Sequence, residues 1–304
     1  MVGGKQVFNI DGGGYSSLVG YNFTIKNASS LGTLTNLPVV LFDILQILNC
    51  DDGFDISNIH SFYLDKTYWT NGNTGTYLTL SGSFTNLQIS GGRVVSDIGE
   101  IGIDVSANPA IDVSASMSKV DFSGEGTSVV PYTNGDIYLG YNFSNRWDVD
   151  CPGIPLETDD NANGDINLDA EVGSGFVTTF NIIGNGAPKK LVGTSTSNNL
   201  FRFTASSDNR IVYKGSKKRF FQIVGSLSFQ GDLNSAIFIF YIARNGVVLP
   251  NTKVYREVGE NNDVGALAVV GAVEMEPNDY IEIWVQRNTG AGNLMTVSLN
   301  VSAK

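Results

Sequence analysis

The sequence is poor in cysteine and histidine, and each shortage argues against a class of function. Only Cys50 and Cys151 occur in 304 residues, whereas a small secreted disulfide scaffold uses several pairs. We therefore expect two free, partly buried thiols. His60 is the single histidine, which disfavours both a histidine-based catalytic triad and a histidine-rich metal site.

Positive charge is also scarce. The chain has 19 Lys and Arg against 30 Asp and Glu, a net charge of −11. Phosphate binding needs clusters of Lys and Arg, and the only compact basic run is Lys214–Arg219, which we interpret as the solvated rim of a loop. Nucleic acid is therefore not an expected partner.

Long apolar runs are absent. The longest, Leu37–Leu48, is interrupted by Asp43 and Gln46 and is too short to cross a bilayer. The first residues lack the basic and then apolar segments of a secretory signal. We expect a soluble protein, without membrane insertion, that is made in a cytoplasm.

Glycine, with 35 residues, is abundant, and long stretches of helix formers are missing. This composition is typical of short strands joined by many turns, so the predicted fold class is all-β. Changes in composition divide the chain into an all-β domain at 1–150, an acidic and Gly/Ser-rich connector at 151–199, and a second all-β domain at 200–304.

The N-terminal half contains one clear internal repeat. The pentapeptide I-D-V-S-A occurs at Ile103–Ala107 and again at Ile111–Ala115. Short alternating strands at this spacing suit a hairpin meander, and hence a β-sandwich. The alternative is a short parallel β-helix, as in phage tailspikes. No coil period is evident elsewhere in this half, which favours the sandwich.

One motif carries defined chemistry. The segment 159–167, D-D-N-A-N-G-D-I-N, matches the start of an EF-hand-type calcium loop, in which oxygen ligands alternate and glycine makes the turn. The candidate calcium ligands are Asp159, Asn161, Asn163 and Asp165. Ala170 stands where the loop has its bidentate acid, so the alternative is a solvated turn without metal. No other cofactor is expected.

The C-terminal half alternates sharply. The segment Ala236–Ala243 is apolar on both faces, which predicts a strand covered on both sides. Asn245 and Gly246 predict a type I′ hairpin turn. In Gly271–Gln286 two strands flank a turn, and Tyr280 and Trp284 lie on the outer face, where large aromatic side chains need a partner.

These segments resemble the TNF-like jelly rolls, which include complement-type globular heads and many phage fibre tips. The resemblance rests on R-I-V-Y-K-G, I-F-I-F-Y-I-A-R-N-G-V-V-L and A-V-E-M-E-P-N-D-Y-I-E-I-W-V, within 200–304. Against the family pattern V-x-L-x-x-G-D-x-I-x-L-x-V, this chain has Asn278 where glycine is usual and keeps Asp279, Ile281, Ile283 and Val285. The resemblance implies a homotrimer, whose candidate interface residues are Phe238, Phe240, Tyr280 and Trp284.

Because neither a collagen repeat nor a signal peptide is present, the resemblance points to a bacteriophage virion. It implies a head or tail fibre, spike or decoration protein without enzymatic activity. The expected partners are its own copies, other virion structural proteins and a host surface glycan.

Two alternatives stay open. A short glycan-cleaving tailspike would need paired carboxylates, for which Asp104, Asp112 and Asp121 are the candidates. A non-viral carbohydrate- or receptor-binding module would stack sugars on exposed aromatic rings, for which Trp69 and Trp147 are the candidates.

Overall fold

The computed structural model describes residues 5–70, 72–135, 137–180, 186–232 and 234–304. Over these residues the regular structure consists of strands and two short 3₁₀ turns. The all-β class predicted from composition is therefore confirmed. The chain divides into two compact units, with the boundary between Thr158 and Asp159. Each unit has its own hydrophobic core.

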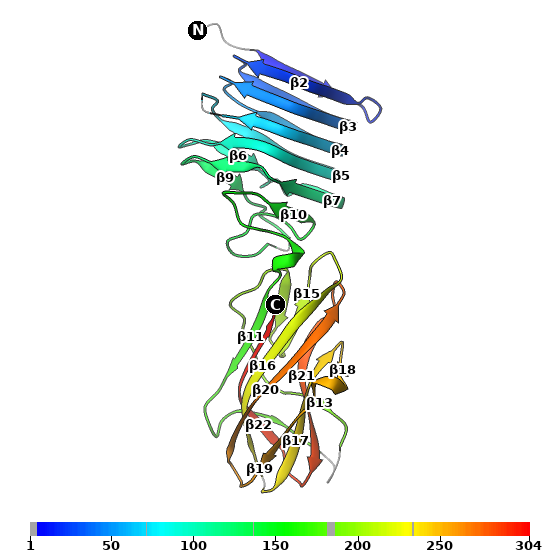
Figure 1. Ribbon diagram of the computed structural model, residues 1–304, viewed down its shortest axis with the longest axis vertical. Coiled ribbons are helices and arrows are strands. Elements are labelled where there is room, and N and C mark those ends of the chain that lie inside the picture. The colour runs from blue at the N-terminus through cyan, green and yellow to red at the C-terminus, as the bar shows by residue number, and fades with distance from the viewer. Residues whose placement is uncertain (1–4, 71, 136, 181–185, 233) are drawn as a thin grey trace. The chain divides into compact units, whose positions relative to one another are not determined.

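The first unit is a parallel β-solenoid. Its strands are β1 (Gln6–Asp11), β2 (Leu18–Lys26), β3 (Ser30–Leu48), β4 (Phe54–Trp69), β5 (Thr76–Val95), β6 (Ile101–Asp104), β7 (Ala110–Ser118), β8 (Asp121–Ser123), β9 (Thr127–Val130) and β10 (Trp147–Asp150). All of their pairings are parallel, and the long strands stack one upon the next (Figure 1). Of the two predicted alternatives, the chain forms the short β-helix and not the sandwich.

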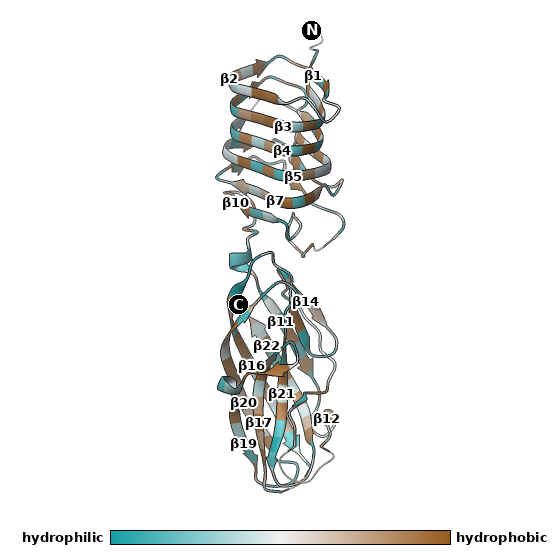
Figure 2. Ribbon diagram, turned by 90° about the vertical axis from the view of Figure 1, so that its right-hand side faces the viewer, coloured by the Kyte–Doolittle hydropathy of each residue, from teal (hydrophilic) through white to brown (hydrophobic). Residues whose placement is uncertain are grey.

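Successive coils differ in length. The register pairs Gly32 with Phe54, Phe54 with Leu78, and Leu78 with Ile103, which gives coils of 22, 24 and 25 residues. Along each strand apolar residues point inward at alternate positions, so brown and teal alternate along the stacked ribbons (Figure 2). The variable coil length is why no constant period was visible in the sequence.

The long strands bend at residues in the left-handed conformation. The first corner is formed by Asn36, Asn58 and Gly82, with φ of 54°, 54° and 69°. The Asn58 side-chain oxygen accepts a hydrogen bond from the Ser83 N–H at 3.1 Å. Asparagine and glycine adopt this conformation at low cost, which explains their use at this corner.

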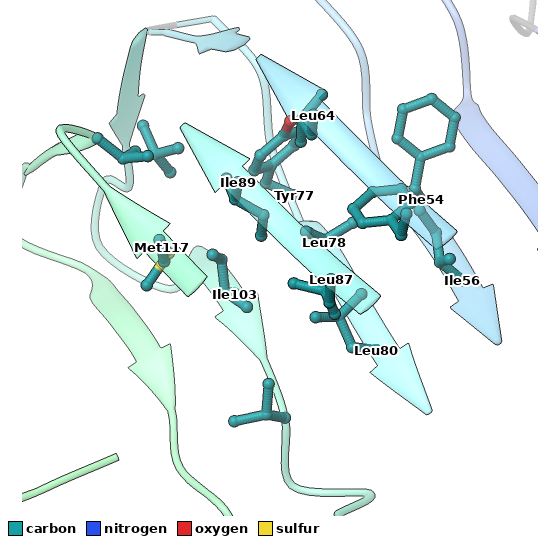
Figure 3. Packing of buried hydrophobic residues seen from close by; sticks show 14 of the residues in the cluster. Phe54, Ile56, Leu64, Tyr77, Leu78, Leu80, Leu87, Ile89, Ile103 and Met117 are labelled. Carbon is teal, nitrogen blue, oxygen red and sulfur yellow. The ribbon is translucent and has the colours of Figure 1, made fainter. Parts of the chain in front are cut away.

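Columns of apolar side chains fill the interior. Phe54, Leu78 and Ile103 form one column, and Leu64, Ile89 and Met117 form another (Figure 3). All six residues are buried. Each coil thus completes the core of its neighbour, as in other repeat architectures.

The I-D-V-S-A repeat does not form a hairpin. Its copies lie in and beside β6 and β7, which pair in parallel with successive stretches of the same strand, β5. The two copies are consecutive faces of one coil. The alternation was interpreted correctly, but the pairing partner lies one coil away in the sequence.

Residues 131–135 and 137–158 cover the C-terminal end of the solenoid core. The Tyr132 hydroxyl donates to the Pro109 carbonyl at 2.7 Å and accepts from the Trp147 indole N–H at 2.9 Å. The rings of Phe143 and Trp147 pack with centroids 4.6 Å apart. The Glu157 carboxylate, which is buried, accepts backbone N–H groups of this segment. The last coil is therefore closed by a packed and hydrogen-bonded cap.

The second unit is a jelly-roll sandwich. Its strands are β11 (Gly164–Asp169), β12 (Phe176–Thr178), β13 (Lys189–Lys190), β14 (Phe203–Ser206), β15 (Arg210–Tyr213), β16 (Arg219–Gly231), β17 (Ala236–Arg244), β18 (Val247–Val248), β19 (Val254–Val258), β20 (Val264–Met275), β21 (Tyr280–Thr289) and β22 (Leu294–Ala303), with 3₁₀ turns η1 (Asp159–Asn161) and η2 (Pro250–Thr252). One sheet has the order β11-β22-β16-β20 and the other β14-β15-β21-β17-β18. All pairings in both are antiparallel, so the predicted TNF-like jelly roll is confirmed.

The predicted connector at 151–199 is corrected by these pairings. Strands β11 and β12 pair with β22, and β13 pairs with β21. The jelly roll therefore begins at Asp159 and not at residue 200. Composition placed the boundary wrongly, because β11, β12 and β13 are short strands separated by stretches without regular structure.

Candidate functional site

The predicted calcium loop is not formed. Its second half, from Gly164 to Asp169, is the extended strand β11, and an extended strand cannot wrap around a cation. Asp165 accepts hydrogen bonds from the Asn199 N–H at 2.7 Å and from the Asn167 amide at 2.7 Å. Asn163 donates to the Asn199 carbonyl. Both carboxylate oxygens of Asp165 therefore already accept hydrogen bonds from the chain itself.

Asp159 has a structural role instead. One carboxylate oxygen lies 2.5 Å from Nη1 of Arg202, and both side chains are only 3% exposed. The other oxygen accepts the backbone N–H groups of Ser216 and Lys217 and the Ser216 hydroxyl, at 2.8 to 3.0 Å. The basic run Lys214–Arg219 is thus part of the anchor for this carboxylate and not only a solvated rim.

Tyr280 and Trp284 find their partners within the chain. The Arg210 guanidinium carbon lies 4.0 Å from the centre of the Tyr280 ring, a cation–π contact. The Trp284 indole N–H donates to Glu282 at 2.9 Å. Both aromatic side chains are half-buried within the single chain. Their remaining exposure therefore does not require a subunit interface.

Glu282 is the centre of this cluster. Its other carboxylate oxygen accepts from Lys190 at 2.9 Å and from Arg210 at 2.8 Å. Burial by itself would raise the pKa of Glu282, but hydrogen bonds from Trp284, Lys190 and Arg210 outweigh burial, and the pKa lies below its usual value. Lys190 and Ser206 likewise lower the pKa of Asp208 to about 2. The cluster is an internally neutralised ion-pair network.

Phe238 and Phe240 are not interface residues. Both are completely buried, and the Phe240 ring lies 4.9 Å from Phe229 of the facing sheet. On the opposite face of β17, Ile239 and Tyr241 are also buried by the chain itself. β17 is therefore covered on both faces, as predicted. Both faces are covered by this chain itself and not by a neighbouring subunit.

The exposed apolar surface lies on the other sheet, on the outer face of β16 and β20. Val224 and Val270 sit directly opposite each other and are 36% and 48% exposed. Phe220, at one end of this face, is 69% exposed. The charged Glu274 lies opposite Phe220, and the other outward positions along the two strands are small or uncharged, namely Gln222, Ser226, Ser228, Ala266, Ala268 and Ala272. We call this surface the β16–β20 face.

A shallow depression of about 640 Å³ crosses this sheet from β20 to β11. Its walls include Ser226, Ser228 and Ala266 of the β16–β20 face, together with Ser298 of β22 and the charged Asp169 of β11. The outer edge strand, β20, has no charged side chain from Val264 to Val273. Natural sheets usually protect such an edge with charge or proline, so this face has the properties of a surface that is covered in an assembly.

Sequence reasoning missed this face although a signal was present. In V-G-A-L-A-V-V-G-A-V, residues 264–273, the inward residues Val269 and Val273 are apolar and buried. The outward residues of the same strand are alanine and valine where a solvated face would carry polar side chains. The absence of alternation was the available clue.

The remaining candidates are dispersed. Asp104, Asp112 and Asp121 lie on β6, β7 and β8, which pair with three different stretches of β5. Asp121 forms an ion pair with Arg93 at 3.3 Å. The structure therefore does not bring these carboxylates together as a glycosidase pair.

Trp69 and Trp147 are buried in the solenoid core and are not available to stack on sugars. Cys50 and Cys151 are free and buried, and burial raises the pKa of the Cys151 thiol to about 11. His60 is exposed on β4. Within the described parts of the chain, no helix is long and apolar enough to cross a membrane.

No family model matches the chain, and no curated protein matches it. Similar solved structures include the Eiger TNF from S. frugiperda, with 9% identity over 47% of this chain and 93% of that one, at a TM-score of 0.33. The PRD1 vertex protein P5 has 10% identity over 47% of this chain and 94% of its own, at a TM-score of 0.30.

The enzymatically active domain of bacteriophage CBA120 tailspike protein 4 is similar over 94% of this chain. The identity is 11%, the TM-score is 0.20, and the match covers 53% of the tailspike chain. This chain thus spans about half of the tailspike domain. With TM-scores this low, none of these likenesses supports an inference about function.

Proposed function

We propose that the protein is a non-enzymatic structural component of a bacteriophage virion, a fibre, spike or decoration protein, that assembles as a homotrimer. The trimer is what the sequence resemblance to TNF-like jelly rolls implies. The observation that carries the proposal is the β16–β20 face, because exposed apolar side chains beside an edge strand without charge from Val264 to Val273 are costly to leave in water. In this proposal the face packs around the three-fold axis.

The surface assignment differs from the one made from sequence. Tyr280 and Trp284 belong to the ion-pair cluster on the opposite sheet, and Phe238 and Phe240 belong to the core. The proposal therefore places the subunit contacts on Val224, Val270 and their neighbours.

Native mass from light scattering tests the proposal. The wild-type chain is expected near three times its mass of 32.6 kDa. Val270→Asp places a charge in a desolvated contact and is expected to release monomers, since an unpaired buried charge costs several kcal/mol. Val247→Asp is the matched control, because Val247 is an exposed valine of the other sheet and its replacement should leave the trimer intact.

A monomeric wild-type chain would refute the trimer, and with it the proposed assembly. Trp284→Asp separates the two surfaces. It is expected to lower the melting temperature by removing the hydrogen bond to Glu282, while the native mass stays unchanged. If Trp284→Asp released monomers and Val270→Asp did not, the trimer would stand and the β16–β20 face would be the wrong surface.

A further inference from the structure

Asparagine is one of the thermally labile residues of proteins, and it is most labile where glycine follows. The main-chain nitrogen of the glycine can attack the asparagine side chain, because glycine has no Cβ to obstruct the approach. Three such pairs lie wholly within the described residues, namely Asn134–Gly135, Asn163–Gly164 and Asn245–Gly246. The attack needs a free side-chain amide and a peptide that can rotate, so the surroundings of each pair decide whether it reacts.

The pair Asn163–Gly164 is held at both residues. The Asn163 N–H donates to the Phe201 carbonyl at 2.9 Å, and the Asn163 carbonyl accepts from the Phe201 N–H at 2.8 Å. The side-chain amide of Asn163 donates to the Asn199 carbonyl at 2.9 Å. Gly164 is buried and begins β11, opposite Ala303 of β22. The peptide between the two residues therefore cannot rotate without breaking the sheet.

The pair Asn245–Gly246 is held through the asparagine side chain. Nδ2 of Asn245 donates to Asp279 at 2.6 Å, and Oδ1 accepts from the Tyr280 N–H at 3.0 Å. The Asn245 N–H also donates to the Tyr280 carbonyl at 3.0 Å. Because both ends of the amide are occupied, its carbon cannot turn toward the Gly246 nitrogen while the fold is intact.

The pair Asn134–Gly135 differs from both. The two residues are exposed, and over the described residues neither the Asn134 side chain nor the Gly135 N–H forms a hydrogen bond. No atom lies within 4 Å of the position that a Cβ would occupy at Gly135. The Asn134 N–H donates to Oδ1 of Asn108 at 2.8 Å. The asparagine is therefore tethered on its N-terminal side, while its side chain and the following peptide are free to approach each other.

We propose that Asn134 is a site of spontaneous deamidation in the folded protein. The Gly135 nitrogen loses its proton to a base in the solvent and forms a bond to Cγ of Asn134. The bond from Cγ to Nδ2 breaks, and Nδ2 leaves as ammonia after taking a proton from the solvent. The five-membered succinimide ring that results is opened by water at either carbonyl, which gives aspartate or isoaspartate.

Each event changes the solenoid cap in two ways. It adds one negative charge to a chain whose net charge is −11. Isoaspartate also routes the main chain through the side-chain carbons, which lengthens it beside Asn108, whose Oδ1 accepts the N–H groups of Thr133 and Asn134 at 2.8 Å. The site lies in the solenoid and does not depend on trimerisation of the jelly roll.

Peptide mapping by mass spectrometry tests the proposal on the native full-length protein. The protein is incubated at mildly alkaline pH in oxygen-labelled water, so that only new deamidation introduces the label. Asn134 is expected to gain the label at least about tenfold faster than Asn163 or Asn245, because a held amide must first open locally. Equal rates at the three residues, or no label at Asn134, would overturn the proposal.

The unfolded protein and one variant are the controls. In concentrated guanidinium chloride the three pairs should react at similar rates. A preference for Asn134 that persisted there would show that the neighbouring sequence decides, and it would overturn the structural argument. Asn134→Gln keeps the amide but would need a six-membered ring, so label at this position should fall to background while the melting temperature stays unchanged. Label that remained in this peptide would assign the reaction to another residue and overturn the site.

Discussion

Replacing Asp159 with asparagine separates a metal ligand from a buried ion-pair partner. The asparagine keeps the shape of the side chain, but it leaves the Arg202 guanidinium, 3% exposed, without this carboxylate. It also replaces one carboxylate oxygen, an acceptor, with an amide NH₂, a donor, beside the N–H groups of Ser216 and Lys217. Breaking a buried pair costs about 3–5 kcal/mol. For a domain of this size each kcal/mol shifts the melting temperature by about 3 °C, so we expect a loss of about 10–15 °C.

Differential scanning calorimetry is the assay, since it follows the jelly roll and the solenoid as separate cores. Asp160→Asn is the matched control: its side chain is 91% exposed and lies 3.7 Å from Arg219, a contact worth about 0–1 kcal/mol. EDTA and added calcium should leave the wild-type transition unchanged. The reasoning would be refuted if EDTA lowered the wild-type transition, calcium restored it, and Asp159→Asn no longer responded.

Two further predictions concern pH and the coil corners. Because the pKa of Glu282 lies below the ordinary glutamate value of 4.5, its ionised carboxylate contributes stability that is present above that pH and is lost as the pH falls through the folded-state pKa. We therefore expect the jelly-roll melting temperature to fall below about pH 4.5, and Glu282→Gln to melt lower at neutral pH with a flatter acid profile; parallel profiles in the two proteins would contradict this. In the solenoid, Gly92 has φ of 93° and a Cβ there would lie 1.9 Å from the Thr67 carbonyl oxygen, whereas the nearest atom to a Cβ at Gly91 is 3.5 Å away. By denaturant unfolding, Gly92→Ala should cost about 2–4 kcal/mol and Gly91→Ala about 1 kcal/mol, and equal costs would show that the backbone at Gly92 relaxes.

Local signals in the jelly roll were sufficient to predict its turns. Asn245 and Gly246 both have positive φ, 53° and 75°, as the predicted type I′ turn requires. Asn278, where the family pattern has glycine, also has a positive φ of 73°, so the departure preserves the turn. These predictions succeeded because each depends on neighbouring residues only.

The solenoid was harder to predict because its pairing partners lie a full coil away. A column position accepts any apolar residue, as Leu34, Ile56 and Leu80 illustrate. The recurring T-L-T-N, D-I-S-N and T-L-S-G at residues 33–36, 55–58 and 79–82 were the available signal. Because the coils vary from 22 to 25 residues in length, these similar segments do not recur at a constant spacing.

The site predictions failed where long-range partners decided the outcome. The calcium motif is a local pattern, but Asp159 is paired with Arg202, 43 residues away. The sequence predicted that the outward aromatic residues Tyr280 and Trp284 need a partner. For Tyr280 this partner is Arg210, 70 positions earlier in the chain. A motif shows which groups are near in sequence, whereas the fold determines whether their charges are already satisfied.

The distribution of charge bears on where copies of this chain can meet. A chain with a net charge of −11 repels its own copies and other acidic proteins, and this repulsion is screened beyond about 8 Å at physiological salt. Close contact is therefore least costly where charged side chains are missing. The central residues of the β16–β20 face are uncharged, so copies of the chain can approach one another there with the least electrostatic repulsion.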